Sequence, residues 1–234
     1  MPFAVVTGAT QGMGKIIAEK LLNEGFSIAV CARNKAKLLQ LETEWKERYP
    51  TATIMIYETD LTIKEELTDF ATAALSHFPA IDLLVNNAGS YTPGTIADEP
   101  EGLLQSMIAV NLYSAYNLTR ALLPSMKEKQ SGHIFNICSI ASLKAYPNGG
   151  SYSISKYALL GFSENLREEL KDHNIKVTAI CPGATYTPSW EGSGVPPERI
   201  MESADVANML WSAYRLSPQA NVETIVMRPV KGDL

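Results

Sequence analysis

The chain has 234 residues, of which 46% are hydrophobic and 19% are charged, and its formal net charge is −5 at pH 7. This composition is ordinary for a globular protein, and the length allows a substantial buried core. The negative charge argues against nucleic acid or an anionic membrane as a partner, and no apolar run is long enough to span a bilayer. Because the N-terminal segment lacks the basic and apolar regions of a signal peptide, we expect a cytoplasmic protein.

Seven short apolar runs alternate with six stretches of helical pattern. The runs predict strands at 3–7, 26–32, 52–58, 81–87, 132–139, 175–181 and 221–228. The intervening stretches predict helices from the turn after the first strand to residue 22, then at 35–48, 62–77, 100–128, 151–172 and 203–216. Continuous apolar strands that alternate with helices indicate a parallel sheet covered on both faces. We therefore predict one α/β domain over residues 1–234, with a Rossmann-like, doubly wound, seven-stranded parallel sheet and ligands at its carboxyl edge.

The first loop at that edge is the glycine-rich turn TGATQGMGK, residues 7–15. Gly8, Gly12 and Gly14 stand between a strand and a helix, where glycine lets the backbone approach a pyrophosphate and the helix N-terminus attracts it. The spacing is G-x-x-x-G-x-G and is not that of a Walker loop. A glycine turn can also simply end a strand. Its position before the first helix favours dinucleotide binding.

The end of the second strand bears on the choice of cofactor. It reads CARNKAK and offers no carboxylate for a ribose 2′-hydroxyl. Arg33 can instead pair with a 2′-phosphate, although an arginine at this place can also be a solvated side chain at a helix start. We therefore favour NADP(H) over NAD(H).

Four polar residues form a candidate catalytic set. Tyr152 and Lys156 are four residues apart in the predicted helix SYSISK, so the phenol and the ammonium group share one face. A nearby ammonium lowers the pKa of a phenol, which suits it to general acid–base catalysis. Ser139 ends the fifth strand, where its hydroxyl can donate to a carbonyl. Asn111 lies in an apolar helical stretch and must find polar partners. Each residue alone is more often an ordinary structural residue.

Further motifs accompany these residues in a recognisable order. NNAG occupies residues 86–89 and PGATYT occupies 182–187. Together with the glycine turn, Asn111, Ser139 and the SYSISK segment, they resemble the short-chain dehydrogenase/reductases over essentially the whole chain. The resemblance is to the single-domain branch that includes 3-oxoacyl-carrier-protein reductases and carbonyl reductases.

The resemblance implies a role for each of these residues. Tyr152 would exchange a proton with the substrate oxygen, Ser139 would orient the carbonyl, Lys156 would lower the pKa of Tyr152, and Asn111 would position Lys156 through a water. Asn86 would brace the sheet. The residues implied to line the cofactor are Gly8, Thr10, Gly12, Met13, Gly14, Arg33, Asp60, Leu61, Asn87, Ala88, Gly89, Tyr152, Lys156, Pro182, Gly183 and Thr187.

Many members of that family carry a longer, helical lid where this chain has the segment 184–202. The glycines and prolines of this segment argue against a long helix. Such a short lid leaves an open site that can admit bulky carbonyls. Tyr146, Tyr186 and Trp190 are candidates for apolar walls, although each can equally be a packing or surface residue. The substrate itself stays open among acyl thioesters, diketones, steroid-like ketones, pterins and sugars.

Neither the cysteines nor the histidines show the spacing of a metal site. Cys31, Cys138 and Cys181 are an odd number without a CxxC pair, which indicates reduced, buried thiols; a redox or metal role is the less favoured alternative. The three histidines are scattered. We therefore expect no bound metal.

The sequence thus predicts an NADP(H)-dependent oxidoreductase that interconverts a carbonyl and a secondary alcohol, working mainly as a reductase. The alternative is a dinucleotide-binding sensor or interaction protein without turnover, which has no need of Tyr152 or Ser139. An extended-branch epimerase does not fit the length. By analogy we expect a small-molecule substrate and a homotetramer or homodimer built on the helices at 100–128 and 151–172, with no nucleic acid or membrane partner.

Overall fold

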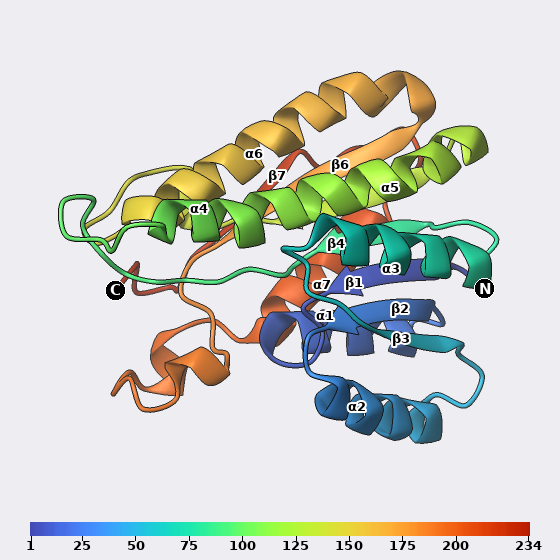
Figure 1. Ribbon diagram of the computed structural model, residues 1–234, viewed down its shortest axis with the longest axis horizontal. Coiled ribbons are helices and arrows are strands. Elements are labelled where there is room, and N and C mark those ends of the chain that lie inside the picture. The colour runs from blue at the N-terminus through green and yellow to red at the C-terminus, as the bar shows by residue number, and fades with distance from the viewer.

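The computed structural model describes residues 1–234 and contains one seven-stranded parallel sheet in the order β3-β2-β1-β4-β5-β6-β7. The strands are β1 Phe3–Thr7, β2 Ser27–Ala32, β3 Ile54–Glu58, β4 Leu83–Asn86, β5 Gly132–Ile137, β6 Ile175–Pro182 and β7 Thr224–Met227. The helices are α1 Gly12–Asn23, α2 Lys35–Arg48, α3 Lys64–His77, α4 Leu103–Ile108, α5 Ser114–Lys129, α6 Gly150–Leu170 and α7 Ser203–Tyr214. This is the predicted Rossmann-like, doubly wound fold (Figure 1).

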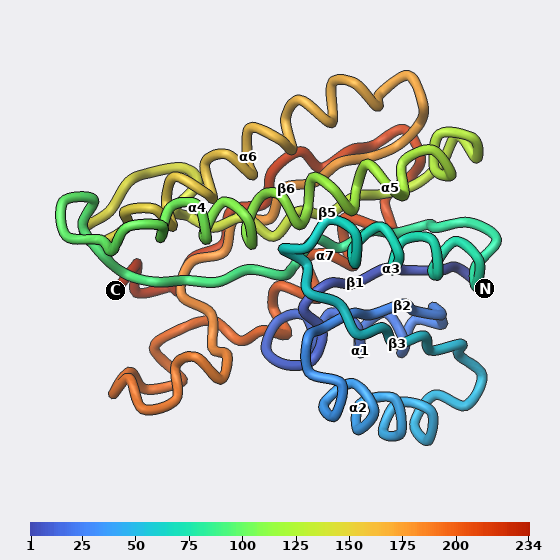
Figure 2. The backbone as a smooth tube through the Cα atoms, in the orientation of Figure 1, coloured from blue at the N-terminus to red at the C-terminus, as the bar shows by residue number.

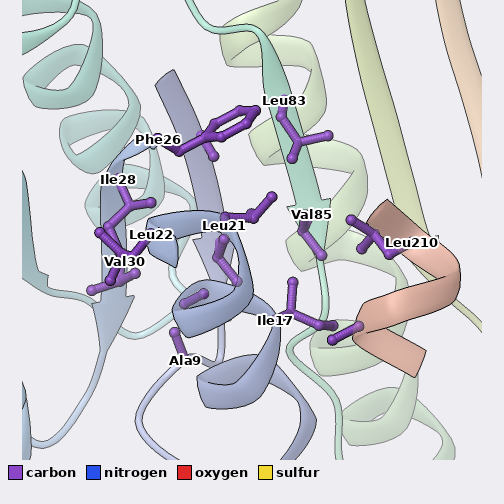
Figure 3. Close-up of a cluster of buried hydrophobic side chains, with 14 of the residues drawn as sticks. Ala9, Ile17, Leu21, Leu22, Phe26, Ile28, Val30, Leu83, Val85 and Leu210 are labelled. Atoms are coloured by element: carbon purple, nitrogen blue, oxygen red, sulfur yellow. The ribbon is translucent and has the colours of Figure 1, made fainter. Parts of the chain in front are cut away.

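Each face of the sheet is covered by a separate apolar core. Side chains of α1, α2 and α7 pack on one face, where Ala4 and Val6 of β1 point. Figure 3 shows Leu21 of α1 and Leu210 of α7 in this cluster, beside Val85 of β4. Helices α3, α5 and α6 cover the opposite face, to which Val5 points. Because successive residues of β1 are buried on opposite faces, the strand reads as one continuous apolar run.

One predicted helix differs from its expected form. The sequence predicts a single helix over 100–128, but α4 begins at Leu103 and a π-helical segment, Ala109–Tyr113, separates it from α5. The buried Asn111 lies in this segment. A π-helical turn inserts an extra residue into an α-helix, so a pattern with the ordinary period of 3.6 residues does not reveal it.

The loops that follow the strands gather at one edge of the sheet. In Figure 2 the segments after β4, β5 and β6 lie at the end of the molecule away from the N-terminus. This is the carboxyl edge, where doubly wound sheets bind ligands. None of the helices combines the length and the apolar character needed to cross a bilayer.

Candidate active site

The turn between β1 and α1 forms a tight cradle. Gly8 and Gly12 have φ angles of 66° and 57°, in the region that disfavours a side chain. A Cβ on Gly14 would lie 2.3 Å from the Gly8 carbonyl oxygen and 2.4 Å from Asn87 Nδ2. Helix α1 begins without a side-chain cap, so its first N–H groups remain free for an anion. The cradle fits the phosphates of a dinucleotide.

The two other residues expected in this turn differ in their surroundings. Thr10 is partly buried in the turn itself. The side chain of Met13 packs against the core beneath α1.

The NNAG segment after β4 is fastened to the glycine turn. Thr7 Oγ1 accepts hydrogen bonds from the backbone N–H groups of Asn87 and Ala88, both at 3.0 Å. Asn87 Nδ2 donates to the carbonyl oxygens of Thr7 and Gly8 at 2.9 and 3.2 Å. These bonds hold the two loops at a fixed separation.

Asn86 instead points into the sheet. Its Nδ2 donates to Asn136 Oδ1 on the neighbouring strand β5 at 2.8 Å and to Thr119 Oγ1 on α5 at 3.0 Å. The prediction that Asn86 braces the sheet is therefore confirmed.

Positive charge gathers where the second strand ends. Arg33 directly follows β2 and is exposed. The two lysines that follow it in the chain both have partners. Lys35 Nζ lies 3.6 Å from a carboxylate oxygen of Glu58, and Lys37 Nζ donates to Gln11 Oε1 at 3.2 Å. Arg33 forms no ion pair with a carboxylate within 4.0 Å. A guanidinium in this position fits a phosphate on an adenosine ribose.

Asp60 and Leu61 follow β3 on the same side of the sheet. Asp60 Oδ1 accepts hydrogen bonds from the hydroxyl and the backbone N–H of Thr62, at 2.7 and 2.9 Å. These bonds, with a smaller contribution from the charge of Arg33, hold the pKa of Asp60 below its usual range. Leu61 packs its side chain against the core under α3.

The candidate catalytic residues come from β5 and α6. Lys156 Nζ lies 5.9 Å from the centroid of the Tyr152 ring, one helical turn away, and donates to the Ile137 carbonyl oxygen at 2.8 Å. Ser139 follows β5 and begins a short 3-10 turn, where its Oγ accepts from the Ala141 N–H at 3.1 Å. Because Oγ accepts from the backbone, the hydroxyl proton of Ser139 is free to point elsewhere.

Asn111 is hydrogen-bonded to the loop after β4 and to helix α6. Its Oδ1 accepts from the Ser90 N–H at 2.8 Å, and its Nδ2 donates to Ser155 Oγ at 2.8 Å. Ser155 Oγ in turn donates to the Tyr152 carbonyl oxygen at 2.7 Å. A Cβ on Gly89 would lie 3.0 Å from Asn111 Oδ1 and 3.4 Å from Lys156 Nζ. Asn111 and Lys156 therefore both border Gly89.

Burial acts on the two titratable groups in opposite directions. It raises the pKa of Tyr152 above its ordinary value, and a hydrogen bond with the Ser139 side chain opposes this rise. Burial lowers the pKa of Lys156. Both effects follow from the cost of a charge away from water. Lys156 is not among the groups that shift the pKa of Tyr152 here, so the lowering of this pKa by Lys156 stays a prediction.

Two other tyrosines border Tyr152. The Tyr91 ring lies 4.8 Å from the Tyr152 ring in an edge-to-face arrangement. Burial, followed by the nearby Tyr91 phenol, raises the pKa of Tyr146. Tyr91 was missed in the sequence, although it stands two residues beyond NNAG at a strand end, where site residues gather. Of the three expected apolar walls, Tyr146 lies in this cluster, whereas neither Tyr186 nor Trp190 forms a ring pair with Tyr152.

The lid over 184–202 contains no α-helix, as its glycines and prolines predict. It holds two 3-10 turns, Pro188–Trp190 and Pro197–Arg199, and a β-bridge between Thr185 and Met201 closes it at the base. Thr187 lies against the glycine turn, since a Cβ on Gly12 would approach its Cβ to 3.3 Å.

The residues before the lid extend the sheet. Pro182 is the last residue of β6, and the N–H of Gly183 donates to the Met227 carbonyl oxygen at 2.8 Å. Cys138 and Cys181 are buried nearby, and all three cysteines are free of disulfides, as predicted.

Comparisons with known proteins agree with this geometry. The family described as short chain dehydrogenase matches residues 2–194. The (S)-acetoin-forming diacetyl reductase of Staphylococcus epidermidis is 35% identical over 206 residues, which cover 88% of this chain and 79% of that protein.

Two solved structures share the fold over nearly the whole chain. The alcohol dehydrogenase of the archaeon Thermococcus sibiricus, complexed with 5-hydroxy-NADP, has a TM-score of 0.91 at 26% identity and covers 100% of this chain and 99% of its own. The closed form of serine dehydrogenase complexed with NADP+ has a TM-score of 0.89 at 28% identity. The match covers 99% of this chain and 96% of that chain. The chain therefore belongs to the short-chain dehydrogenase/reductase family, as an enzyme that acts on alcohol or carbonyl groups of small molecules with a nicotinamide dinucleotide.

Proposed function

We propose that this enzyme is an NADP(H)-dependent reductase of a ketone or diketone, with Tyr152 as the general acid and base. The observation that supports this most is the convergence of Tyr152, Ser139 and Lys156. Lys156 borders Gly89 of the NNAG segment, which is fastened to the glycine turn, and Asn111 is bonded to the same helix as Tyr152. The similarity to a diacetyl reductase favours diketones among the open substrate classes. A binding protein without turnover has no use for these side chains.

The residues divide the chemistry among them. A bound nicotinamide dinucleotide supplies or accepts the hydride. The Tyr152 phenol donates its proton to the carbonyl oxygen, and the Ser139 hydroxyl, whose oxygen already accepts from Ala141, donates a hydrogen bond to the same oxygen. A raised pKa keeps Tyr152 protonated at neutral pH, which suits a proton donor.

The activity is tested by following NADPH absorbance with a panel of ketones, diketones, acyl thioesters and sugars, with NADH run in parallel. We expect consumption that depends on one carbonyl class and is faster with NADPH. A folded sample that binds NADPH but consumes none with any carbonyl would contradict the proposal and favour the sensor.

The cofactor preference is tested at Arg33. Replacing Arg33 by Ala removes the unpaired guanidinium, so we expect NADPH to bind about 10- to 100-fold more weakly while NADH binding changes less than about twofold. Lys35→Ala is the matched control, because Lys35 lies against Glu58. Equal weakening of both cofactors, or of neither, in Arg33→Ala would refute the role of Arg33 in choosing NADP(H).

A further inference from the structure

The first turn of α6 is capped from a distant loop. Glu99 lies in the segment between β4 and α4 and is partly buried. Its Oε1 accepts a hydrogen bond from the Ser151 N–H at 2.8 Å, and its Oε2 accepts from the Ser151 hydroxyl. The helix has no side-chain cap from its own N-terminal neighbour. A carboxylate at this end of a helix is favoured both by charge-assisted hydrogen bonds and by the helix dipole.

The two loops fit together closely around this carboxylate. A Cβ on Gly150, whose φ is +30°, would lie 1.9 Å from Glu99 Oε1 and 2.6 Å from the Gly94 carbonyl oxygen. The Gly94 N–H also donates to the Asn148 carbonyl oxygen at 3.1 Å. The loop after β4 is therefore attached to the loop before α6 by backbone and side-chain bonds.

The clamp joins two segments that each carry a ring of the candidate active site. Tyr152 directly follows Ser151 in the first turn of α6, and Tyr91 lies on the same loop as Glu99, between β4 and α4. The two rings meet edge to face at 4.8 Å. A shift of the Glu99 carboxylate would thus move the first turn of α6 relative to Tyr91.

We propose that Glu99 is a positioning residue, which clamps the loop after β4 to the first turn of α6 and so fixes Tyr152 for proton transfer. The clamp rests on the proposed function of Tyr152, and Glu99 itself does not touch the reacting atoms. Because a misplacement of about 1 Å can cost about 100-fold in rate, loss of the clamp lowers kcat. The NNAG end of the same loop stays fastened to the glycine turn through Thr7, so the cofactor cradle is left intact.

The kinetic test compares Glu99→Ala, Glu99→Gln and Glu101→Ala. We expect Glu99→Ala to lower kcat by about 10- to 100-fold with the NADPH dissociation constant within about twofold of wild type. Glu99→Gln keeps a carbonyl oxygen for the Ser151 N–H and should recover kcat to within about fivefold. Glu101 is exposed on the same segment, so its replacement controls for charge. A kcat of Glu99→Ala within about twofold of wild type would overturn the proposal.

Hydrogen exchange gives a readout that needs no turnover. We expect the Ser151 amide to exchange at least about tenfold faster in Glu99→Ala and at the wild-type rate in Glu101→Ala. Unchanged exchange at Ser151 would overturn the clamp even if kcat fell. The variant Tyr152→Phe separates the two claims: if it keeps the wild-type rate, the proposed function fails, and the exchange rates alone then decide whether the clamp exists.

A double-mutant cycle covers the case in which Glu99→Ala is poorly folded. Ser151→Ala removes the hydroxyl donor and leaves the N–H bond to Glu99. If the two side chains act through one contact, adding Ser151→Ala to Glu99→Gln lowers kcat less than it does in the wild type. Equal fold-losses of kcat in both backgrounds would refute a shared contact.

Discussion

At the scale of single residues, burial favours the uncharged forms of both Tyr152 and Lys156. The pKa of Tyr152 is raised and that of Lys156 is lowered. Lys156 finds a fixed acceptor in the Ile137 carbonyl oxygen, 2.8 Å away, and Tyr152 has the hydroxyl of Ser139 beside it. A protonated phenol next to a second hydroxyl donor is an arrangement suited to protonating a carbonyl oxygen.

His133 gives a pH dependence of stability that is separate from the site. Burial, and then the charge of Lys176, lowers the pKa of this β5 side chain from 6.5 to about 3. Below pH 6.5 the unfolded chain therefore binds a proton that the folded chain excludes. As the pH is lowered from 6.5 to about 3, the free energy of unfolding decreases. Between about pH 7.5 and about pH 5 this one group accounts for a loss of about 2 kcal/mol.

The measurement is urea unfolding of wild type and His133→Gln at these two pH values. We expect the difference in unfolding free energy between the two pH values to be about 2 kcal/mol smaller in the variant. His77→Gln replaces an exposed histidine and serves as the control. An unchanged difference in His133→Gln would show that His133 is not the group that titrates.

At the scale of elements, the packing of the first turn of α1 against the neighbouring loops shapes the dinucleotide cradle. Gly14→Ala would place a methyl group 2.3 Å from the Gly8 carbonyl oxygen, which belongs to the backbone and cannot rotate away. We expect the variant to lose about 1–3 kcal/mol of unfolding free energy and to bind NADPH at least about tenfold more weakly.

Gly161→Ala is the matched control for this substitution, because a Cβ on that helical glycine would meet no atom within 4 Å. It should raise the unfolding free energy by up to about 1 kcal/mol, since alanine is the better helix former. Chemical unfolding and fluorescence titration with NADPH measure both effects. A Gly14→Ala protein with wild-type stability and affinity would contradict the close packing of the turn.

The sequence predicts the elements of this fold better than their interruptions. Apolar runs and alternation suffice for all seven strands, because burial on both faces leaves a continuous signal. The π-helical segment around Asn111 and the cap from Glu99 to Ser151 leave no such signal in the sequence. Asn111 and Ser155, which share a hydrogen bond, are 44 positions apart in the chain, and Glu99 and Ser151 are 52 positions apart. No local pattern carries such pairs, and the resemblance supplied Asn111 but not Glu99.

At the scale of the whole molecule, helices α4, α5 and α6 leave large apolar side chains uncovered. The exposed residues on them and on the π-helical segment between α4 and α5 are Leu104, Tyr113, Tyr116, Ile154 and Tyr157. Neighbouring apolar side chains on one surface are typical of contacts between protein chains. These exposed side chains lie on the helices where the predicted homodimer or homotetramer would form its contacts. The assembly itself stays a prediction.

Light scattering on the purified protein tests that expectation. We expect a mass of two or four times the chain mass of 25.6 kDa. Replacing Tyr116 by Glu puts a charge on this surface and should shift the mass toward a single chain. A wild-type protein that scatters as a monomer at the concentrations used for the activity assay would contradict the proposed assembly.

The proposed function depends on proton transfer by Tyr152. Its most direct test is the steady-state rate of NADPH oxidation by Tyr152→Phe with the carbonyl that the wild type reduces, together with the dissociation constant of NADPH. Tyr157→Phe, an exposed tyrosine on the same helix, is the control. We predict a fall in kcat of about 1000-fold with NADPH affinity within about twofold. A kcat within about tenfold of wild type would show that Tyr152 is not the proton donor.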